Sequence, residues 1–427
     1  MNLTIRGATT FSGKCHDLHV AGNVFVDAHP PGAPVIDADG LIALPGLVDP
    51  HCHLREPSGD DTPAETLVSG TAAAARGGFT CVAAMPNTTP ACDTAKRARW
   101  LLRQAKDPAL SARVVPIGAV TQDRAGTCLA ELNGMYDAGV RLFSDDGVAV
   151  ASFSMMRDAV LTLAYVGGIV ADHCQSPVMA GPRAWWPDSL DKDDGDIPPD
   201  EIWPQAAETS IVMRDVQLAS DIWYPIHLCH ISCAESVDVI RWAKQRHIPV
   251  SAEVTPHHLL LTAERLQSHD TRFKVNPPLR SAEDVEALRA GLEDGIITMI
   301  GTDHAPHTAA AKDKPIPEAS PGMTGLEQAL AVVMETMVNP GRLDWLRVAW
   351  MMSFTPARRL LSLRNQARAL GPGMPANLVL VDPERRHIVD ADDTASLARN
   401  NPYAGLDLPD PVMLTMWAGK VTHDRLR

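Results

Sequence analysis

Apolar residues recur along the middle of the chain as short runs that alternate with segments of helical spacing. The helical segments include 63–78, with Pro63 near its start, 128–139, closed by Gly139, and 281–295, closed by Gly295. The apolar runs predict strands at 44–53, 80–87, 112–120, 140–147, 168–174, 225–232, 248–256 and 296–306. Eight strand-helix units in succession predict a closed parallel (β/α)8 barrel of the TIM type, an α/β fold.

Both ends of the chain show a different pattern, in which short strands follow one another without helices. Strands are predicted at 2–8, 17–28, 34–44, 377–383 and 412–423. We therefore expect a small β-sandwich domain built from residues 1–45 and 370–427, and a barrel domain over residues 46–369. Helical segments at 325–337, 343–354 and 355–363 lead from the eighth strand back to the small domain.

Two long segments are predicted near the mouth of the barrel. Residues 181–205 are rich in proline and aspartate and follow the fifth strand, so we expect a loop that covers part of the mouth. Residues 307–325 follow the eighth strand and contain small, charged and proline residues. They predict a mobile lid, or otherwise a solvated loop.

Titratable side chains stand where five of the predicted strands end. They are His51 and His53, Asp145 and Asp146, His173, His230, and Asp303. All strands of a parallel barrel end on one face, where active sites are built. Taken singly, the histidines could be hydrogen-bonded core residues and "DDG" at 145–147 an ordinary turn. Together they form the type of ligand set that holds a pair of divalent metal ions.

Composition and charge limit the partners of the protein. The chain has 427 residues and a net charge of −14, which argues against nucleic acid or an anionic membrane as the main partner. Recognition of an anionic substrate must therefore be local. The N-terminus shows no leader and no apolar run approaches a membrane span, while eight scattered cysteines suggest a reducing cytoplasm.

Several motifs together carry a family resemblance. They are "DPHCHLREPSGDDTPAET", "ARGGFTCVAAMPNTTP", "RLFSDDGV", "ADHC", "HLCHIS", "AEVTPHHLLLT", "FKVNPPLRS" and "GTDHAPH". With them the chain resembles, over nearly its full length, the dihydroorotases of the amidohydrolase superfamily. The resemblance is to the bacterial type, in which an aspartate bridges the metal ions.

The resemblance implies two bound divalent ions, most simply Zn²⁺. His51, His53 and Asp303 would hold the more buried ion, and His173 and His230 the second. One aspartate would bridge both, and the spacing to the next histidine favours Asp146, with Asp145 as the alternative. Hydantoinases and allantoinase are expected to carry a carboxylated lysine on this strand, whereas "GVRLFSDDG" contains no lysine.

The resemblance also implies contacts to the substrate, dihydroorotate or N-carbamoyl-aspartate of pyrimidine synthesis. Arg55, Asn87 and His307 would grip its carboxylate, and Asn276 with the backbone of Pro321 and Gly322 would contact the ring amides. Asp303 would accept a proton from the attacking water and pass it to the leaving ring nitrogen. Without the resemblance, Arg55 could pair with Glu56 or Asp60, and Asn87 could be a turn residue.

Alternatives and departures from the family pattern remain. The chain could be a hydantoinase-like cyclic amidohydrolase, or a non-catalytic partner of aspartate carbamoyltransferase, although such chains tend to lose ligands. A homodimer, and an active enzyme that binds that transferase, are both open. Gln175 and Ser176 stand where the family more often has acidic residues, which puts in doubt the support around His173. His304 is expected to support Asp303.

Overall fold

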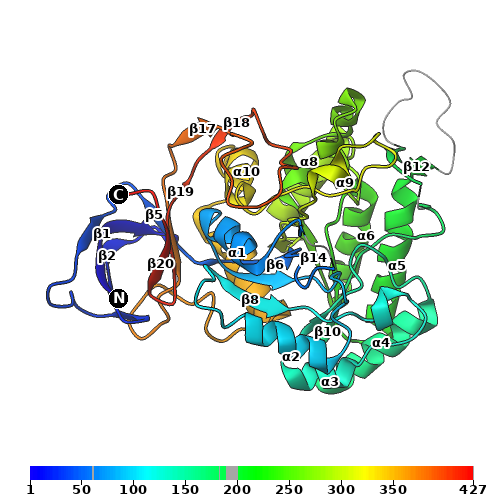
Figure 1. Cartoon of the computed structure of the whole chain (residues 1–427), viewed down its shortest axis with the longest axis horizontal. Helices are drawn as coiled ribbons and strands as arrows, with labels where there is room; N and C mark the ends of the chain where they lie inside the picture. The colour runs from blue at the N-terminus through cyan, green and yellow to red at the C-terminus, as the bar shows by residue number, and fades with distance from the viewer. Residues whose placement is uncertain (60–61, 182, 189–200, 427) are drawn as a thin grey trace.

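Eight parallel strands form a closed barrel in the larger part of the molecule (Figure 1). The computed structural model describes residues 1–59, 62–181, 183–188 and 201–426. The barrel strands are β6 (Leu47–Cys52), β7 (Phe79–Ala84), β8 (Arg113–Pro116), β9 (Leu142–Phe143), β10 (Ile169–Asp172), β13 (Ile226–Leu228), β14 (Val250–Val254) and β15 (Met299–Ile300). Parallel bridges from Gly118 to Phe143 and from Cys52 to His304 close the ring. The predicted (β/α)8 barrel is confirmed.

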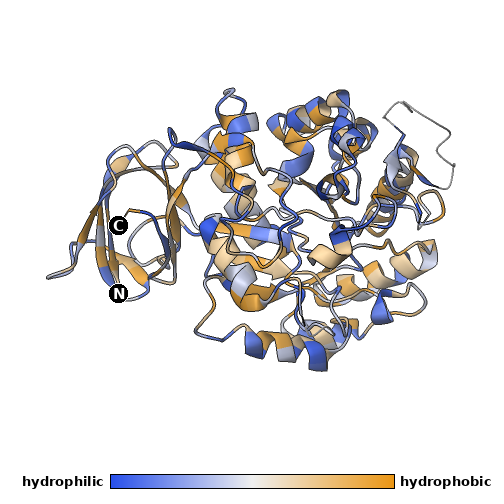
Figure 2. Ribbon diagram, turned by 45° about the horizontal axis from the view of Figure 1, so that its top comes forward, coloured by the Kyte–Doolittle hydropathy of each residue, from blue (hydrophilic) through white to orange (hydrophobic). Residues whose placement is uncertain are grey.

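Helices cover the outside of the barrel. They are α1 (Leu67–Arg76), α2 (Ala95–Gln104), α3 (Leu132–Ala138), α4 (Phe153–Val166), α5 (Gln205–Ile222), α6 (Ala234–Gln245) and α8 (Ala282–Glu293). Hydrophilic and hydrophobic residues both occur along each helix (Figure 2), as expected when one stripe packs on the strands. Every residue of β6 and β7 is buried, which explains why these strands are apolar throughout.

The first helix begins later than its sequence pattern predicts. The pattern starts near Pro63, but α1 begins at Leu67, because Thr66 caps it: the Thr66 hydroxyl accepts a hydrogen bond from the Ser69 amide at 3.1 Å. Gly139 ends α3 as predicted, with φ of 117° in the left-handed region. Residues 63–65 thereby stay in the loop at the mouth of the barrel.

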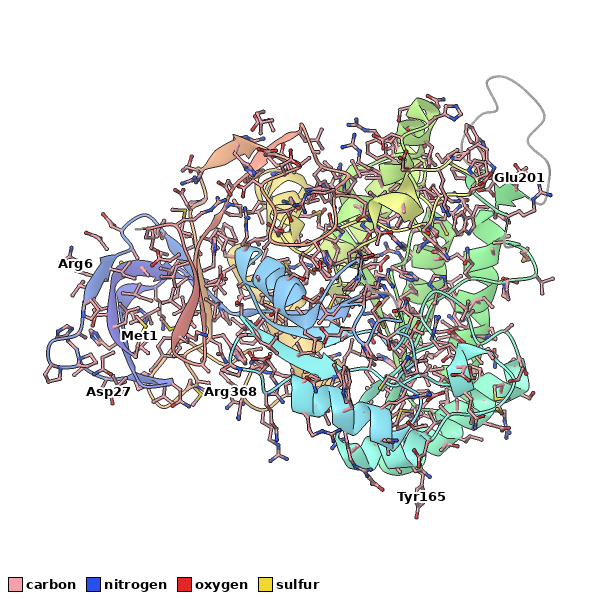
Figure 3. All side chains as sticks on the ribbon, in the orientation of Figure 1. Met1, Arg6, Asp27, Tyr165, Glu201 and Arg368 are labelled. Carbon is pink, nitrogen blue, oxygen red and sulfur yellow. The ribbon has the colours of Figure 1, made fainter. Side chains whose placement is uncertain are left out.

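Strands from both chain ends form one sheet beside the barrel. The sheet contains β1 (Asn2–Thr10), β2 (Cys15–Ala21), β3 (Val24–Val26), β4 (Val35–Asp37), β5 (Ile42–Pro45), β16 (Leu378–Val381), β19 (Val412–Trp417) and β20 (Lys420–Asp424). Antiparallel pairing of β5 with β16 joins the two ends of the chain. Leu3, Ile5, Leu378 and Met416 contribute to a core of its own. Met1 and Arg6 lie at this end of the molecule, far from Glu201 (Figure 3).

A hairpin of the C-terminal segment packs against the barrel instead of joining that sheet. It consists of β17 (Arg386–Ile388) and β18 (Asp407–Pro409). Val389 and Tyr403, beside the hairpin, share a buried cluster with Phe273, Ile316 and Met323. This segment also contains Asn400, whose Nδ2 donates a hydrogen bond to the Ala305 carbonyl in the polypeptide that follows β15.

The remaining elements are short. They are α7 (Pro256–Leu260), α9 (Ala309–Lys312), α10 (Ala329–Val333), α11 (Trp345–Ala349), 3₁₀ turns at Gln122–Arg124, Ala263–Ser268 and Thr271–Phe273, and π-helical turns at Met334–Val338, Trp350–Phe354 and Pro356–Leu360. In the predicted 181–205 loop, β11 (Trp186–Pro187) pairs with β12 (Ile202–Trp203), and residues 182 and 189–200 lie outside the described residues. No helix in the described ranges is long and apolar enough to span a membrane.

Candidate active site and metal centre

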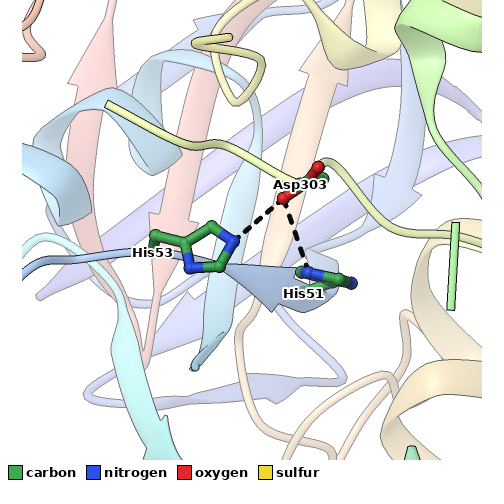
Figure 4. A group of neighbouring side chains, drawn as sticks. All are labelled: His51, His53 and Asp303. Atoms are coloured by element: carbon green, nitrogen blue, oxygen red, sulfur yellow. Dashed lines mark hydrogen bonds and ion pairs between the residues drawn. The ribbon is translucent and has the colours of Figure 1, made fainter. Parts of the chain in front are cut away.

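The end of β6 and the polypeptide after β15 bring two histidines and an aspartate together (Figure 4). His53 Nε2 lies 2.9 Å from Asp303 Oδ1, and His51 Nε2 lies 3.5 Å from the same oxygen. Backbone pairing aligns these residues, since the Asp303 amide donates to the His51 carbonyl at 2.9 Å. Residues two apart on a strand face the same side, so both imidazoles reach Asp303.

Asp146 lies among all four predicted imidazoles. Its Oδ1 is 3.3 Å from His51 Nε2 and 3.5 Å from both His173 Nδ1 and His230 Nε2, and its Oδ2 is 3.3 Å from His53 Nε2. A single carboxylate with oxygens directed at both groups of histidines has the geometry of a bridging ligand.

Asp145 is turned away from the histidines. Its Oδ1 accepts hydrogen bonds from the amides of Val120 at 2.8 Å and Thr121 at 3.0 Å, and its Oδ2 accepts one from the Thr121 hydroxyl. These contacts tie the end of β9 to the loop after β8. The geometry therefore favours Asp146 over Asp145 as the residue that faces a metal.

The site has the electrostatics of a cation site. Burial raises the pKa of Asp146 and Asp303, but attraction to the surrounding imidazoles, together with the hydrogen bond between Asp303 and His53, outweighs burial and holds each pKa below its ordinary value. Both groups are carboxylates near neutral pH. His51 Nε2 and Asp146 Oδ1 are buried and make no hydrogen bond to any described residue. Such atoms need a partner, and a divalent cation fits nitrogen and oxygen donors of this kind.

A buried glutamate that the sequence pattern did not reveal supports His51. Glu253 on β14 lies with Oε1 2.6 Å from His51 Nδ1 and Oε2 3.2 Å from His227 Nε2. The contact to Nδ1 leaves His51 Nε2 directed at Asp146 and Asp303. The only sequence signal was a charged residue inside the apolar run "IPVSAEVTP".

Side-chain amides support two other histidines. Asn87 Oδ1 lies 2.8 Å from His53 Nδ1, and Gln175 Oε1 lies 3.2 Å from His173 Nε2. Gln175 therefore contacts His173 without the negative charge that the family pattern has nearby. His173 presents Nδ1 to Asp146, whereas His51, His53 and His230 present Nε2.

His304 does not have the role expected from the sequence. Its Nε2 lies 3.2 Å from Glu65 Oε2, and its Nδ1 accepts a hydrogen bond from the Gly325 amide at 3.2 Å. Because both ring nitrogens are engaged there, the prediction that His304 supports Asp303 was wrong. The ring instead ties the loop before α1 to Gly325, the last residue of the predicted lid.

Three residues with a predicted carboxylate-binding role line one cavity. Arg55, Asn87 and His307 surround a space of about 440 Å³ at the mouth of the barrel. Arg55 Nε donates to the Pro306 carbonyl at 3.2 Å, which fixes the guanidinium beside the segment that carries Asp303. Glu56 accepts instead from the Leu67 amide at 2.8 Å, and no Arg55–Glu56 ion pair occurs among the described residues. Asp60, the other partner considered for Arg55, lies outside the described residues.

The residues predicted to contact the substrate ring lie on two adjacent segments. Asn276 Nδ2 donates to Gln175 Oε1 at 2.9 Å and lies 3.1 Å from His173 Nε2, while its buried Oδ1 makes no hydrogen bond to any described residue. The Pro321 carbonyl accepts from His307 Nε2 at 2.8 Å, and the Gly322 amide donates to the Lys274 carbonyl at 2.9 Å. Asn276 therefore offers a free acceptor, whereas the Pro321–Gly322 backbone is already bonded.

Three residues of the site have a strained backbone. Arg55, His230 and Asp303 have backbone φ values of 53°, 32° and 45°. These values lie in the left-handed region, which residues other than glycine rarely adopt. Strained residues of this kind cluster at functional sites, where surrounding contacts hold them. For Asp303 the backbone hydrogen bond to the His51 carbonyl supplies that support, and for Arg55 the hydrogen bond from its Nε to the Pro306 carbonyl supplies it.

Comparison with known sequences finds relatives in the dihydroorotase and amidohydrolase families. Residues 40–236 match the dihydro-orotase-like family and residues 211–422 match the amidohydrolase family. The chain is 45% identical to a dihydroorotase of Streptomyces coelicolor, over 98% of this chain and 97% of that protein. It is 46% identical to a dihydroorotase of Leifsonia xyli, over 98% of this chain and 95% of that protein.

Comparison with solved structures gives the same architecture at low sequence identity. The L-hydantoinase of Arthrobacter aurescens superposes with a TM-score of 0.86 at 24% identity, over 99% of this chain and 96% of that chain. The dihydropyrimidinase of Brevibacillus agri superposes with a TM-score of 0.85 at 20% identity, over 100% of this chain and 96% of that chain. At this identity the likeness shows the fold alone.

Proposed function

Since this chain belongs to the dihydroorotase family and is a cyclic amidohydrolase of pyrimidine biosynthesis, we propose that its chemistry takes place at the cluster around Asp146. The reaction interconverts dihydroorotate and N-carbamoyl-aspartate. The observation that carries the proposal is the carboxylate of Asp146, whose oxygens lie 3.3 to 3.5 Å from four imidazoles of the barrel rim.

The cluster fits a pair of divalent ions, which we propose to be Zn²⁺. His51, His53 and Asp303 form one compact group of donors, and His51, Asp146 and His230 form another. His51, His53 and Asp303 would hold the first ion, His173 and His230 the second, and Asp146 both. When bound, such ions lower the pKa of a water molecule and polarise a carbonyl oxygen.

The protein's own residues orient the substrate and move the proton. Arg55, with Asn87 and His307, would bind the substrate carboxylate through the planar fork of its guanidinium. Asn276 Oδ1 would accept a hydrogen bond from a ring N–H. In hydrolysis a C–O bond forms at the ring amide carbon, the C–N bond breaks, and Asp303 carries the proton of the water to the leaving nitrogen.

Arg55→Ala is expected to raise the KM for dihydroorotate far more than it lowers kcat. Truncating one partner of a buried charged contact costs about 2–5 kcal/mol, so KM should rise by about 30-fold or more. The change is measured by steady-state kinetics with dihydroorotate as the varied substrate.

Arg55→Lys is the matched control, because it keeps the positive charge and loses the two-point fork. We expect an intermediate KM. An Arg55→Ala enzyme with the KM of the wild type would remove Arg55 from the substrate site.

Metal analysis of the purified full chain, combined with turnover assays, tests the proposed function. We expect about two Zn²⁺ per chain, loss of dihydroorotate turnover after chelation, and recovery on adding Zn²⁺. Unsubstituted hydantoin, which lacks the carboxylate, should be a much poorer substrate. Full activity after the metal is removed would overturn the metal assignment, and faster turnover of hydantoin would overturn the substrate assignment.

Other aspects of the biology stay predictions from the sequence. These are a cytoplasmic location, a homodimer, and an association with aspartate carbamoyltransferase. The mobile lid over residues 307–325 and the domain boundaries near residues 45 and 370 are likewise predictions.

A further inference from the structure

A buried lysine joins two segments at the mouth of the barrel. Lys312 is the last residue of α9, and only 7% of its surface is exposed. Its Nζ donates to three backbone carbonyls, those of Ser320 at 2.9 Å, Gly322 at 3.0 Å and Lys274 at 3.3 Å. Because all three partners are acceptors, the contacts use all three N–H groups of an ammonium.

Those carbonyls belong to the two segments with a predicted role at the substrate ring. Lys274 stands two residues before Asn276, and Ser320 and Gly322 flank Pro321. The Gly322 amide in turn donates to the Lys274 carbonyl at 2.9 Å, so the two segments are hydrogen-bonded directly as well. Lys312 lies at the point where they meet.

The 320–322 segment is also packed tightly on its other side. A Cβ atom on Gly322 would lie 2.7 Å from His307 Nε2 and 3.0 Å from the Ala305 Cβ, and the φ of 145° at Gly322 favours glycine. His307 Nε2 bonds to the Pro321 carbonyl at 2.8 Å. The segment is therefore held between His307 on one side and the Lys312 ammonium on the other.

We propose that Lys312 is a positioning residue for the substrate ring, whose ammonium fixes the 274–276 and 320–322 segments relative to each other and to His307. This inference rests on the proposed function, in which Asn276 and His307 contact the substrate; His307 is bonded to the Pro321 carbonyl of the 320–322 segment. Lys312 itself acts through these residues.

The chemistry of the site favours this role over simple packing. Burial, followed by repulsion from Lys274, lowers the pKa of Lys312 to about 7, whereas the three carbonyl acceptors favour the ammonium over the neutral amine, which has only two N–H groups. Among the described residues, the hydrogen bonds of Lys312 Nζ go to backbone carbonyls, and Asp270 attracts the ammonium without a direct ion pair. An apolar side chain of similar length could fill the space, but it could not hold three carbonyls at fixed positions.

The test compares Lys312→Met with Lys314→Met in the full-length, metal-loaded enzyme. Lys314→Met removes an exposed positive charge from the same segment and is the matched control. We expect Lys312→Met to raise the KM for dihydroorotate by at least about tenfold, because a displaced binding segment weakens substrate contacts. Metal content should be unchanged, and Lys314→Met should behave as the wild type.

Hydrogen exchange provides a readout that is independent of turnover. In Lys312→Met the amides of Gly322 and Met323 should exchange faster, while the amides of β6 and β14 keep their protection. Lys312→Arg, which keeps a cation with several donors, should restore part of the substrate affinity.

A folded Lys312→Met enzyme with wild-type KM and wild-type exchange at 320–323 would overturn the proposal. So would a general loss of protection across the barrel, which would indicate a structural role only. If Lys312→Met does not fold, Lys312→Gln is tested in its place, with a smaller rise in KM expected. Wild-type enzyme that fails to turn over dihydroorotate would instead overturn the proposed function, and the exchange data would still test the contact between the two segments.

Discussion

Asp303→Asn is expected to lower kcat for dihydroorotate by about three orders of magnitude, in the middle of the range for loss of a general acid-base group. Asparagine keeps the shape of the side chain and tolerates the left-handed φ of 45° at this position, so the backbone should be preserved. An amide cannot take up a proton from the attacking water or deliver one to the leaving nitrogen. The measurement is kcat, with the metal content determined on the same sample.

The metal content separates the two roles proposed for Asp303, since its carboxylate would also be a ligand. A matched control is Asp313→Asn, which removes an exposed carboxylate from the segment after the barrel rim and should leave kcat unchanged. Asp303→Asn protein that keeps its metal and more than about a tenth of the wild-type kcat would contradict the assignment of Asp303 as the proton carrier.

Asp146→Asn is expected to lose bound metal and to lower kcat/KM by at least about 100-fold. Asp145→Asn is expected to keep the metal content and the kcat/KM of the wild type. The carboxylate of Asp146 faces four imidazoles, and its charge offsets the positive charge of bound cations. The carboxylate of Asp145 instead accepts hydrogen bonds from the amides of Val120 and Thr121 and from the Thr121 hydroxyl.

These two substitutions are controls for each other, because they make the same change at neighbouring buried positions. The metal-to-protein ratio after gel filtration and kcat/KM are measured for both variants. Asp145→Asn should instead lower the melting temperature, since it weakens hydrogen bonds that join two loops. Loss of metal in Asp145→Asn, with metal retained in Asp146→Asn, would transfer the bridging role to Asp145.

The sequence by itself determined the architecture and the family. Strand-helix alternation from residue 44 to residue 306 predicted the barrel, because each pattern reports which face of a local element is buried. The positions of His51, His173, His230 and Asp303 at strand ends then predicted their convergence, because parallel strands of a barrel end at one rim. Nothing in that argument required knowledge of side-chain directions.

Only the tertiary structure decided which atoms meet. The sequence spacing favoured Asp146 over Asp145, but only the fold shows which of the two carboxylates faces the histidines. Glu253 reaches His51 from 202 positions away, and Lys312 joins segments 38 and 8 positions away. Such contacts arise from the packing of distant elements, and a local pattern carries no information about them. Local patterns report burial and therefore fix the fold, whereas the orientation of a polar side chain depends on partners that the chain supplies from elsewhere.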